Sequence, residues 1–143
     1  MNLLNEDIKI TLVSPAAADG QDDPTFTNVD MAGYDGVLFL CTVGTITGSG
    51  TVTMAIGQAA TDTTVDALSG ASVAAATSTE SDMIIGVDIF RPLDRYVGGG
   101  IVRAVANSVL GGVIAIQYKA KNRPVTQSGL ADTLVALVSP AES

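Results

Sequence analysis

The sequence contains no histidine and no tryptophan, and it has one cysteine in 143 residues. Without histidine, the chain lacks the usual general base, the Ser–His and Cys–His pairs and the commonest metal ligand. The single cysteine excludes an intrachain disulfide. Cys41 lies in the apolar run 36–43, which predicts a small buried side chain rather than a nucleophile. We therefore expect a protein that is not an enzyme, with no catalytic residue and no cofactor.

Carboxylates are the remaining candidates for a chemical site. Glu80, Asp88 and Asp94 each lie beside the end of an expected strand, where an acid that caps a turn or forms an ion pair is ordinary. Three acids fall within residues 19–23, but their spacing is not that of a calcium loop. These patterns favour structural carboxylates, and we expect no metal site.

Charge of both signs is scarce, because seven Lys and Arg stand against fifteen Asp and Glu, for a net charge of −8. The cations are spread along the sequence, and nucleic acid binding needs clustered cations, so we expect no nucleic acid partner. The first ten residues lack the pattern of a signal peptide, and no apolar run has the length of a membrane span. We expect synthesis in a reducing cytoplasm and no membrane partner. The mean hydropathy is nonetheless positive, which predicts apolar patches that a partner covers.

The pattern of apolar residues predicts strands. Residues 83–121 contain three apolar, β-branched runs, separated by an arginine-bearing corner and by a glycine turn. In the last run, Ile114, Ile116 and Tyr118 alternate with smaller or polar residues, which predicts a strand covered on one side. Three consecutive strands are therefore expected in this stretch.

The same alternation predicts further strands along the chain. Residues 36–43 are apolar on both faces, which is typical of a central strand, and residues 51–56 alternate. The glycine-rich segment 44–50 between these two runs predicts that they form a hairpin. The least patterned segment, 58–81, contains at 71–79 a weak edge strand or a loop. The other expected elements are a first strand at 8–13, a solvated loop at 16–24, a short strand at 26–31 and a last strand at 133–138.

These elements predict a single domain over residues 1–143, with an all-β fold. We expect an antiparallel β-sandwich or jelly-roll-like barrel of about eight strands with extended terminal arms. Residues 1–7 would form the N-terminal arm, and residues 122–143 a C-terminal arm or last strand. The pentapeptide Leu-Val-Ser-Pro-Ala occurs at both 12–16 and 137–141, which favours edge strands or arms that end at the same Ser-Pro pair.

The densest polar cluster of the sequence consists of Arg91, Asp94, Arg95 and Tyr96, at the junction of two expected strands. One interpretation is an exposed corner with an Asp–Arg ion pair that contributes little to stability. The other is a protein interface, because Arg and Tyr combine planar hydrogen bonding with a large contact area. Both interpretations place the cluster at a strand junction, and these four residues are the candidate interface.

A series of short motifs follows in order along nearly the whole chain. They are Val29–Phe39, Gly44–Gly48, Ile89–Val97, Arg103–Ala104, Asn107, Ala115–Tyr118 and Leu137–Glu142. In this order they resemble a family of small tailed-bacteriophage proteins that are encoded among the head genes. Each motif is short, so the resemblance lies in their order of appearance.

The resemblance implies a virion structural protein, a capsid decoration or cement protein that binds the outer surface of the assembled head and bridges major capsid protein subunits. Its partners would be the major capsid protein and copies of itself, with a trimer favoured and a dimer as the alternative. It would lie on the capsid surface after synthesis in the cytoplasm of the bacterial host.

Two other functions are alternatives. A head–tail connector or tail component would also be rich in strands, and copy number separates it from a cement protein. A carbohydrate- or receptor-binding β-module ranks lower, because Trp is absent and only three Tyr could serve as binding platforms.

Overall fold

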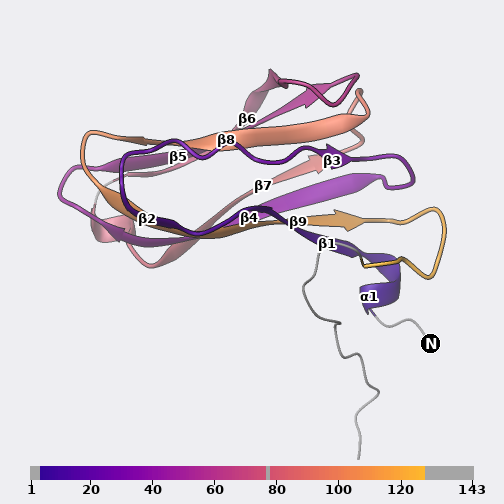
Figure 1. Cartoon of the computed structure of the whole chain (residues 1–143), viewed down its shortest axis with the longest axis horizontal. Helices are drawn as coiled ribbons and strands as arrows, with labels where there is room; N and C mark the ends of the chain where they lie inside the picture. Colours follow the sequence, from indigo (N-terminus) through magenta and orange to yellow (C-terminus); the bar gives the residue numbers. More distant parts are fainter. Residues whose placement is uncertain (1–3, 77, 128–143) are drawn as a thin grey trace, which may run out of the picture.

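The computed structural model describes residues 4–76 and 78–127, which form a sandwich of two antiparallel β-sheets (Figure 1). The first sheet has the strand order β1-β9-β4-β7, with β2 also paired to β9, and the second has the order β3-β8-β5-β6. The strands of the first sheet are β1 (Lys9–Ser14), β2 (Ala17–Gly20), β4 (Gly36–Ile46), β7 (Met83–Phe90) and β9 (Ser108–Tyr118). Those of the second are β3 (Val29–Asp30), β5 (Thr51–Ala59), β6 (Asp66–Ala76) and β8 (Tyr96–Ala104). The expected all-β sandwich is confirmed.

The core lies between the two sheets and uses the alternating positions of their strands. Phe39 and Cys41 of β4 and Met54 of β5 are almost fully buried in one hydrophobic cluster. Phe26, which precedes β3, stacks on Phe39 with ring centroids 5.9 Å apart. Burial raises the pKa of the Cys41 thiol to about 11, so the thiolate is disfavoured. The prediction that Cys41 is a small buried side chain is confirmed.

The expected hairpin between residues 36–43 and 51–56 is wrong. β4 pairs with β7 and β9, whereas β5 pairs with β6 and β8 in the other sheet. The chain between β4 and β5 therefore crosses from one sheet to the other. The two apolar runs meet as opposed layers of the core rather than as neighbours in one sheet. Alternation predicts which side chains are buried, but it does not separate a strand that pairs from a strand that packs across the core.

β9 is covered on one side, as predicted, and the covered side is the more polar one. Ala115 and Gln117 face the core and are almost fully buried. Ile114 is 39% exposed, and it shares the outer face with Ile116 and Tyr118, which are partly exposed. This strand is therefore apolar on the face that the sandwich leaves uncovered.

Other segments differ from their expected structure or extend it. The loop expected at 16–24 contains β2, which pairs with β9. The segment 71–79 belongs to the edge strand β6 up to Ala76 and then to the 3-10 turn η1 (Ser78–Glu80). In the expected N-terminal arm, Leu4–Asp7 forms a helical turn, α1. The strand expected at 133–138 lies outside the described residues.

Arg103 of β8 explains why the expected loop is attached to the sheets. Its side chain is buried, and its guanidinium donates hydrogen bonds to the carbonyl oxygens of Asp22 (2.6 Å), Ala18 (2.8 Å) and Ser108 (2.7 Å). Its backbone N–H donates to the carboxylate of Asp23 at 2.8 Å. One buried cation therefore ties residues 18–23 to both sheets, a contact that no local sequence pattern reveals.

Replacing Arg103 tests this attachment. Arg103→Leu leaves three carbonyl oxygens without their donor, and we expect the free energy of unfolding to fall by about 3 kcal/mol. Urea denaturation measures it, with Val102→Ala as the control on the exposed side of the same strand. If Arg103→Leu lowers the free energy of unfolding no more than Val102→Ala does, the proposed role of Arg103 in attaching residues 18–23 is contradicted.

Candidate interaction surface

The candidate interface residues lie at one end of the sandwich, in the corner between β7 and β8. Arg91 follows β7, Asp94 and Arg95 precede β8, and Tyr96 is the first residue of β8. Arg91 has a left-handed backbone conformation, with φ of 52°, which turns the chain out of the strand. Leu93 at the tip is 92% exposed. The corner is therefore a protrusion with an apolar tip between cationic side chains.

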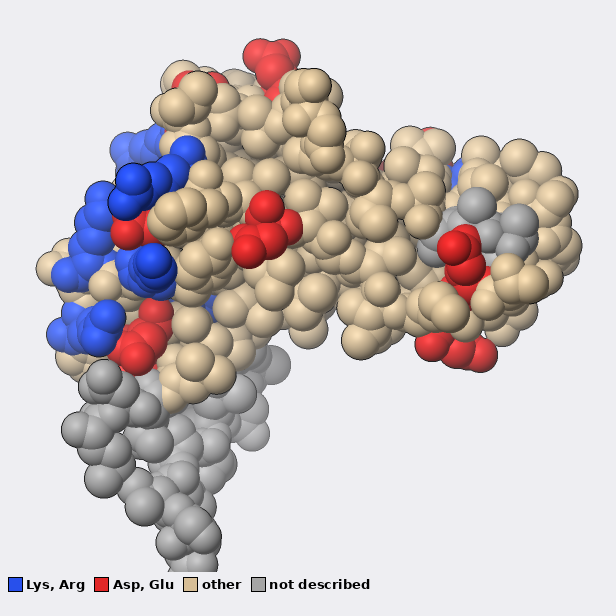
Figure 2. Space-filling view, turned by 180° about the vertical axis from the view of Figure 1, so that it is seen from behind, with Lys and Arg blue, Asp and Glu red and all other residues tan. Residues whose placement is uncertain are grey.

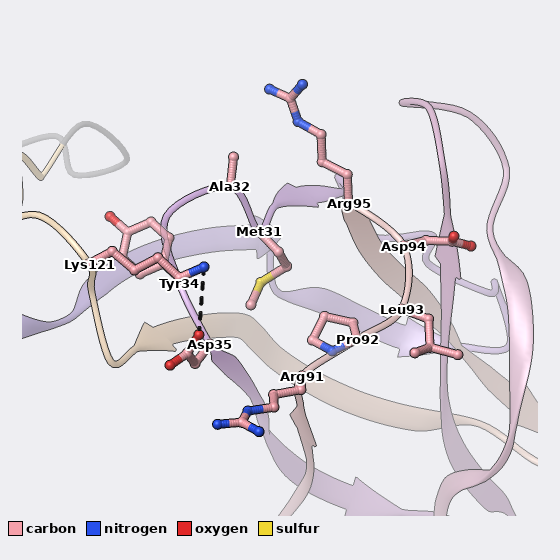
Figure 3. Close-up of a pocket in the computed structure, with 10 residues that line it drawn as sticks. All are labelled: Met31, Ala32, Tyr34, Asp35, Arg91, Pro92, Leu93, Asp94, Arg95 and Lys121. Atoms are coloured by element: carbon pink, nitrogen blue, oxygen red, sulfur yellow. Dashed lines mark ion pairs between the residues drawn. The ribbon is translucent and has the colours of Figure 1, made fainter.

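The corner forms one wall of an open pocket of about 500 Å³ (Figure 3). Figure 3 shows Arg91 and Arg95 at separate sides of this pocket, with Asp94 pointing away from Arg95. The opposite wall includes Tyr34 and Lys121. Of the four predicted residues the pocket brings together Arg91, Asp94 and Arg95, whereas Tyr96 is not part of its lining.

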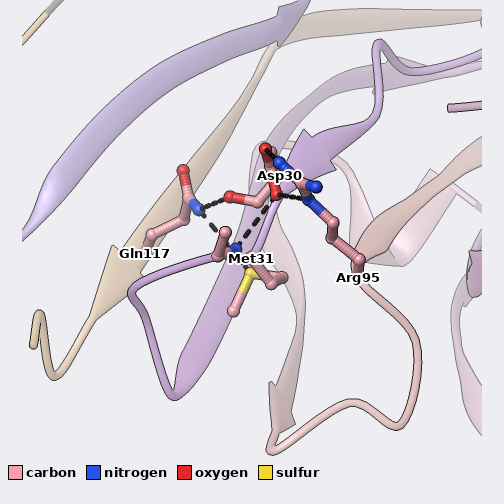
Figure 4. Close-up of polar contacts among 5 residues, drawn as sticks. Asp30, Met31, Arg95 and Gln117 are labelled. Carbon is pink, nitrogen blue, oxygen red and sulfur yellow. Dashed lines mark hydrogen bonds and ion pairs between the residues drawn. The ribbon is translucent and has the colours of Figure 1, made fainter. Parts of the chain in front are cut away.

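The acidic partner of Arg95 is Asp30, not its neighbour Asp94. The guanidinium makes two hydrogen bonds of 2.8 Å to the Asp30 carboxylate (Figure 4). These bonds lower the pKa of Asp30 below its ordinary value of 3.8, and the N–H of Ala32 and the charge of Lys9 act in the same direction. Arg95 is therefore held in one orientation at the surface by a bidentate pair.

Gln117 ties this pair to the first sheet. Its side-chain amide donates to the carbonyl oxygen of Asp30 at 2.8 Å and contacts the sulfur of Met31 at 3.6 Å (Figure 4). Sequence reasoning missed both partners, because Asp30 and Gln117 are 65 and 87 residues away from the groups that they bind. Only the pairing of β3 with β8 and the inward orientation of Gln117 bring them together.

Most of the Lys and Arg side chains in this view gather at the same end of the molecule, although they are dispersed in the sequence (Figure 2). Arg103 is an exception, because it is buried beside β2 and β9. Besides Arg95 with Asp30, two of the gathered cations have acidic partners, Lys121 with Asp35 at 3.9 Å and Arg123 with Asp7 at 3.0 Å. Neither Arg91 nor Lys119 forms an ion pair within the part of the chain that the structure describes. We call this region, with Arg91, Arg95, Lys119, Lys121 and Arg123, the cationic end.

Phe90, the last residue of β7, lies where the cationic end meets the first sheet. The Arg91 guanidinium and the Lys119 ammonium lie 5.1 Å and 5.0 Å from its ring centroid. The Tyr118 ring stacks beside it at 6.4 Å, and the Tyr118 hydroxyl donates to the Asp88 carboxylate at 2.6 Å. Partial burial, together with this carboxylate, raises the pKa of Tyr118 to about 12. Aromatic and cationic side chains in one exposed group are typical of protein interfaces.

The outward-facing positions of the first sheet continue from this cluster as an apolar surface. The strand register places Leu12 opposite Ile114, Ile114 opposite Leu40, and Leu40 opposite Gly86. We define the outer apolar face as Ile10, Leu12, Leu38, Leu40, Ile84, Phe90, Ile114, Ile116 and Tyr118. Leu12, Ile84 and Phe90 are between 49% and 67% exposed. This sheet therefore has an apolar face on each side, and the sandwich covers only one of them.

Residues 4–76 and 78–127 contain neither a metal-binding cluster nor a membrane-spanning helix. No group of three or more Cys, Asp or Glu residues there is arranged to hold a metal ion. None of the helices in those ranges combines the length and apolar character needed to span a bilayer.

Comparison with known proteins defines the class of this one, an all-β sandwich domain. No protein-family model and no curated protein sequence matches the chain. Among solved structures, the PBSX exported protein XepA aligns with 96% of this chain at a TM-score of 0.57 and 12% identity, and the chain spans 46% of XepA. A protein of the disulfide-linked pili of Bacillus endospore appendages aligns with 81% of this chain and covers 93% of its own length, at a TM-score of 0.42 and 14% identity. The likeness to XepA shows the fold.

The Asp30–Arg95 pair predicts a specific dependence on pH. The folded-state pKa of Asp30 is lowered, so the pair stabilises the fold above pH 3.8 and the contribution is lost as pH falls through that lowered pKa. In Arg95→Gln we expect the pKa of Asp30 to rise, because the largest lowering contact is removed. Carboxyl-detected NMR titration measures it. The control is Arg91→Gln, which removes an arginine that has no ion pair in the described part of the chain. It should leave the pKa of Asp30 unchanged. An equal pKa in the parent and in Arg95→Gln would contradict the pairing.

Proposed function

We propose that this protein is a structural protein of a tailed-bacteriophage virion, a cement protein that binds the outer surface of the assembled head and bridges major capsid protein subunits. In this role it is not an enzyme, and its partners are the major capsid protein and copies of itself. The family resemblance of the sequence supports the assignment to the head, and the likeness to the PBSX exported protein XepA supports the fold on which the proposal rests.

The outer apolar face is the observation that carries the proposal. Soluble monomers rarely expose a contiguous apolar patch larger than a few hundred Å², and a patch on a flat sheet is suited to a broad protein surface rather than to a small ligand. A protein whose role is to cover another protein accounts for it directly.

The cationic end fits the same role. A cement protein acts at many symmetric sites, and each copy adds its binding energy to the stability of the shell, so modest affinity at each site is sufficient. Arg91 and Lys119 lie over Phe90 at the border of the outer apolar face. They can provide the charged rim that gives an interface its specificity.

Binding to purified heads that lack this protein tests the proposal. Leu12 and Ile114 are opposite each other in the first sheet, and the double variant Leu12→Lys with Ile114→Lys places two charges on the β1–β9 part of the outer apolar face. We expect head binding, measured by co-sedimentation, to weaken by at least about tenfold. The matched control is Val102→Lys with Val105→Lys, at exposed apolar positions associated with the second sheet. Equal binding of the two double variants would contradict the proposal.

Copy number separates the proposed function from its alternative. Quantitative mass spectrometry of purified virions gives the ratio of this protein to the major capsid protein. A cement protein predicts a ratio of similar order to one, because its sites repeat with the shell. A few copies per virion would instead assign the chain to the head–tail connector or the tail.

A further inference from the structure

β7 forms an open edge of the first sheet, because no other strand in residues 4–76 or 78–127 pairs with it beyond β4. Its sequence, MIIGVDIF, contains neither Pro nor Lys and only one charged residue, Asp88. Ile84 and Phe90 on this strand are among the exposed large apolar side chains. Natural proteins usually protect such an edge with prolines, lysines or bulges, and this one lacks them. The edge is therefore suited to pairing with another strand.

The phase of the β4–β7 ladder determines which backbone groups face outward. Arg91 donates its N–H to the carbonyl oxygen of Asp35 at 2.7 Å, just beyond the pairing of Phe90 with Gly36. Hydrogen-bonded pairs alternate along an antiparallel ladder, so the odd-numbered residues of β7 bond to β4. The even-numbered residues Ile84, Gly86, Asp88 and Phe90 therefore direct both N–H and C=O to the open edge. Their side chains lie on the outer face.

We propose that two copies of this chain pair through β7, antiparallel, about a two-fold axis at Val87. In this register Ile84 of each copy lies opposite Phe90 of the other, and Gly86 lies opposite Asp88. The outward N–H and C=O groups then form about eight hydrogen bonds. The two first sheets become one continuous sheet, and two apolar pairs, each Ile84 with Phe90, close the contact on its outer face.

Other registers are less favourable, which selects the axis at Val87. Side-chain parity allows shifts of two residues only. A shift in one direction places Asp88 opposite Ile84 and Phe90 opposite Asp82, so both apolar pairs are lost. A shift in the other direction places the Asp88 carboxylates of the two copies opposite each other, and like charges in that position are destabilising. The register at Val87 avoids both of these costs. In it, Gly86 of one copy lies opposite Asp88 of the other and leaves room for the Asp88 carboxylate, which keeps its hydrogen bond from Tyr118.

Opposite charges at the two ends of the paired strands favour the same register. Beyond the ladder, Met83 of one copy lies opposite Arg91 of the other, so Asp82 comes next to that arginine. Asp82 and Arg91 are both exposed, and neither forms an ion pair within the described part of its own chain. The two-fold axis repeats the pair at the other end. A second copy is therefore the partner that this edge fits, and between a trimer and a dimer it favours the dimer.

Sedimentation velocity of the purified full-length chain over a range of concentrations tests the contact without any capsid. We expect the parent protein to form a dimer and Ile84→Lys to be monomeric, because a lysine at this position replaces an apolar pair by a charge at the edge. The matched control Val102→Lys changes a similarly exposed apolar strand residue of the second sheet and should remain a dimer. Circular dichroism confirms that each variant is folded.

A charge exchange tests the register itself. Arg91→Asp places an acid next to Asp82 of the second copy, and we expect the dimer to be lost. The double variant Arg91→Asp with Asp82→Arg restores the opposite charges, and we expect the dimer to return. A structural role of Arg91 within one chain would not be rescued by Asp82→Arg.

Three results would overturn the proposal. They are a parent protein that is monomeric at every concentration, an oligomer that Ile84→Lys leaves intact, and a charge exchange that fails to restore the dimer. The double variant Leu12→Lys with Ile114→Lys changes β1 and β9, which are three and two strands away from β7, and should dimerise normally. Failure of the dimer and failure of head binding are therefore distinguishable.

Discussion

The first sheet of this protein is apolar on both faces, and a sandwich of two sheets can bury only one of them. The inner face meets the second sheet through Phe39, Cys41 and their neighbours, and this contact accounts for the fold. The outer apolar face has no such cover within residues 4–76 and 78–127. A protein that covered this face would recover about 25 cal/mol for each Å² of apolar surface that it removes from water. The interaction role that we propose rests on this constraint.

The polar network at one end connects the fold to that role. The Gln117 side chain points from β9 into the core and donates a hydrogen bond to the carbonyl oxygen of Asp30. The Asp30 carboxylate in turn accepts two hydrogen bonds from Arg95. The corner that carries Arg91 and Leu93 is therefore anchored to both sheets rather than left as a free loop. A preorganised corner loses less conformational entropy when a partner binds it.

Alternation in the sequence predicts burial well and pairing poorly. It predicts the strand at Met83–Phe90, the burial of Cys41 and the all-β class, because each depends on neighbouring residues. It fails for the hairpin between β4 and β5, because two strands that pack across a core show the same alternation as two that pair. It also fails for residues 16–24, where the deciding contact is the distant Arg103. In the candidate interface, four residues were identified from their local density, whereas Asp30 and Gln117 required the tertiary structure.

The most direct test of this account is a cryo-electron microscopy reconstruction of the purified virion, in which the orientation of the sandwich on its partner can be read. The account predicts that the β1-β9-β4-β7 sheet faces the capsid and that its outer apolar face is covered by major capsid protein. A reconstruction in which this protein is present but its outer apolar face is open to solvent, with the second sheet against the shell, would contradict it.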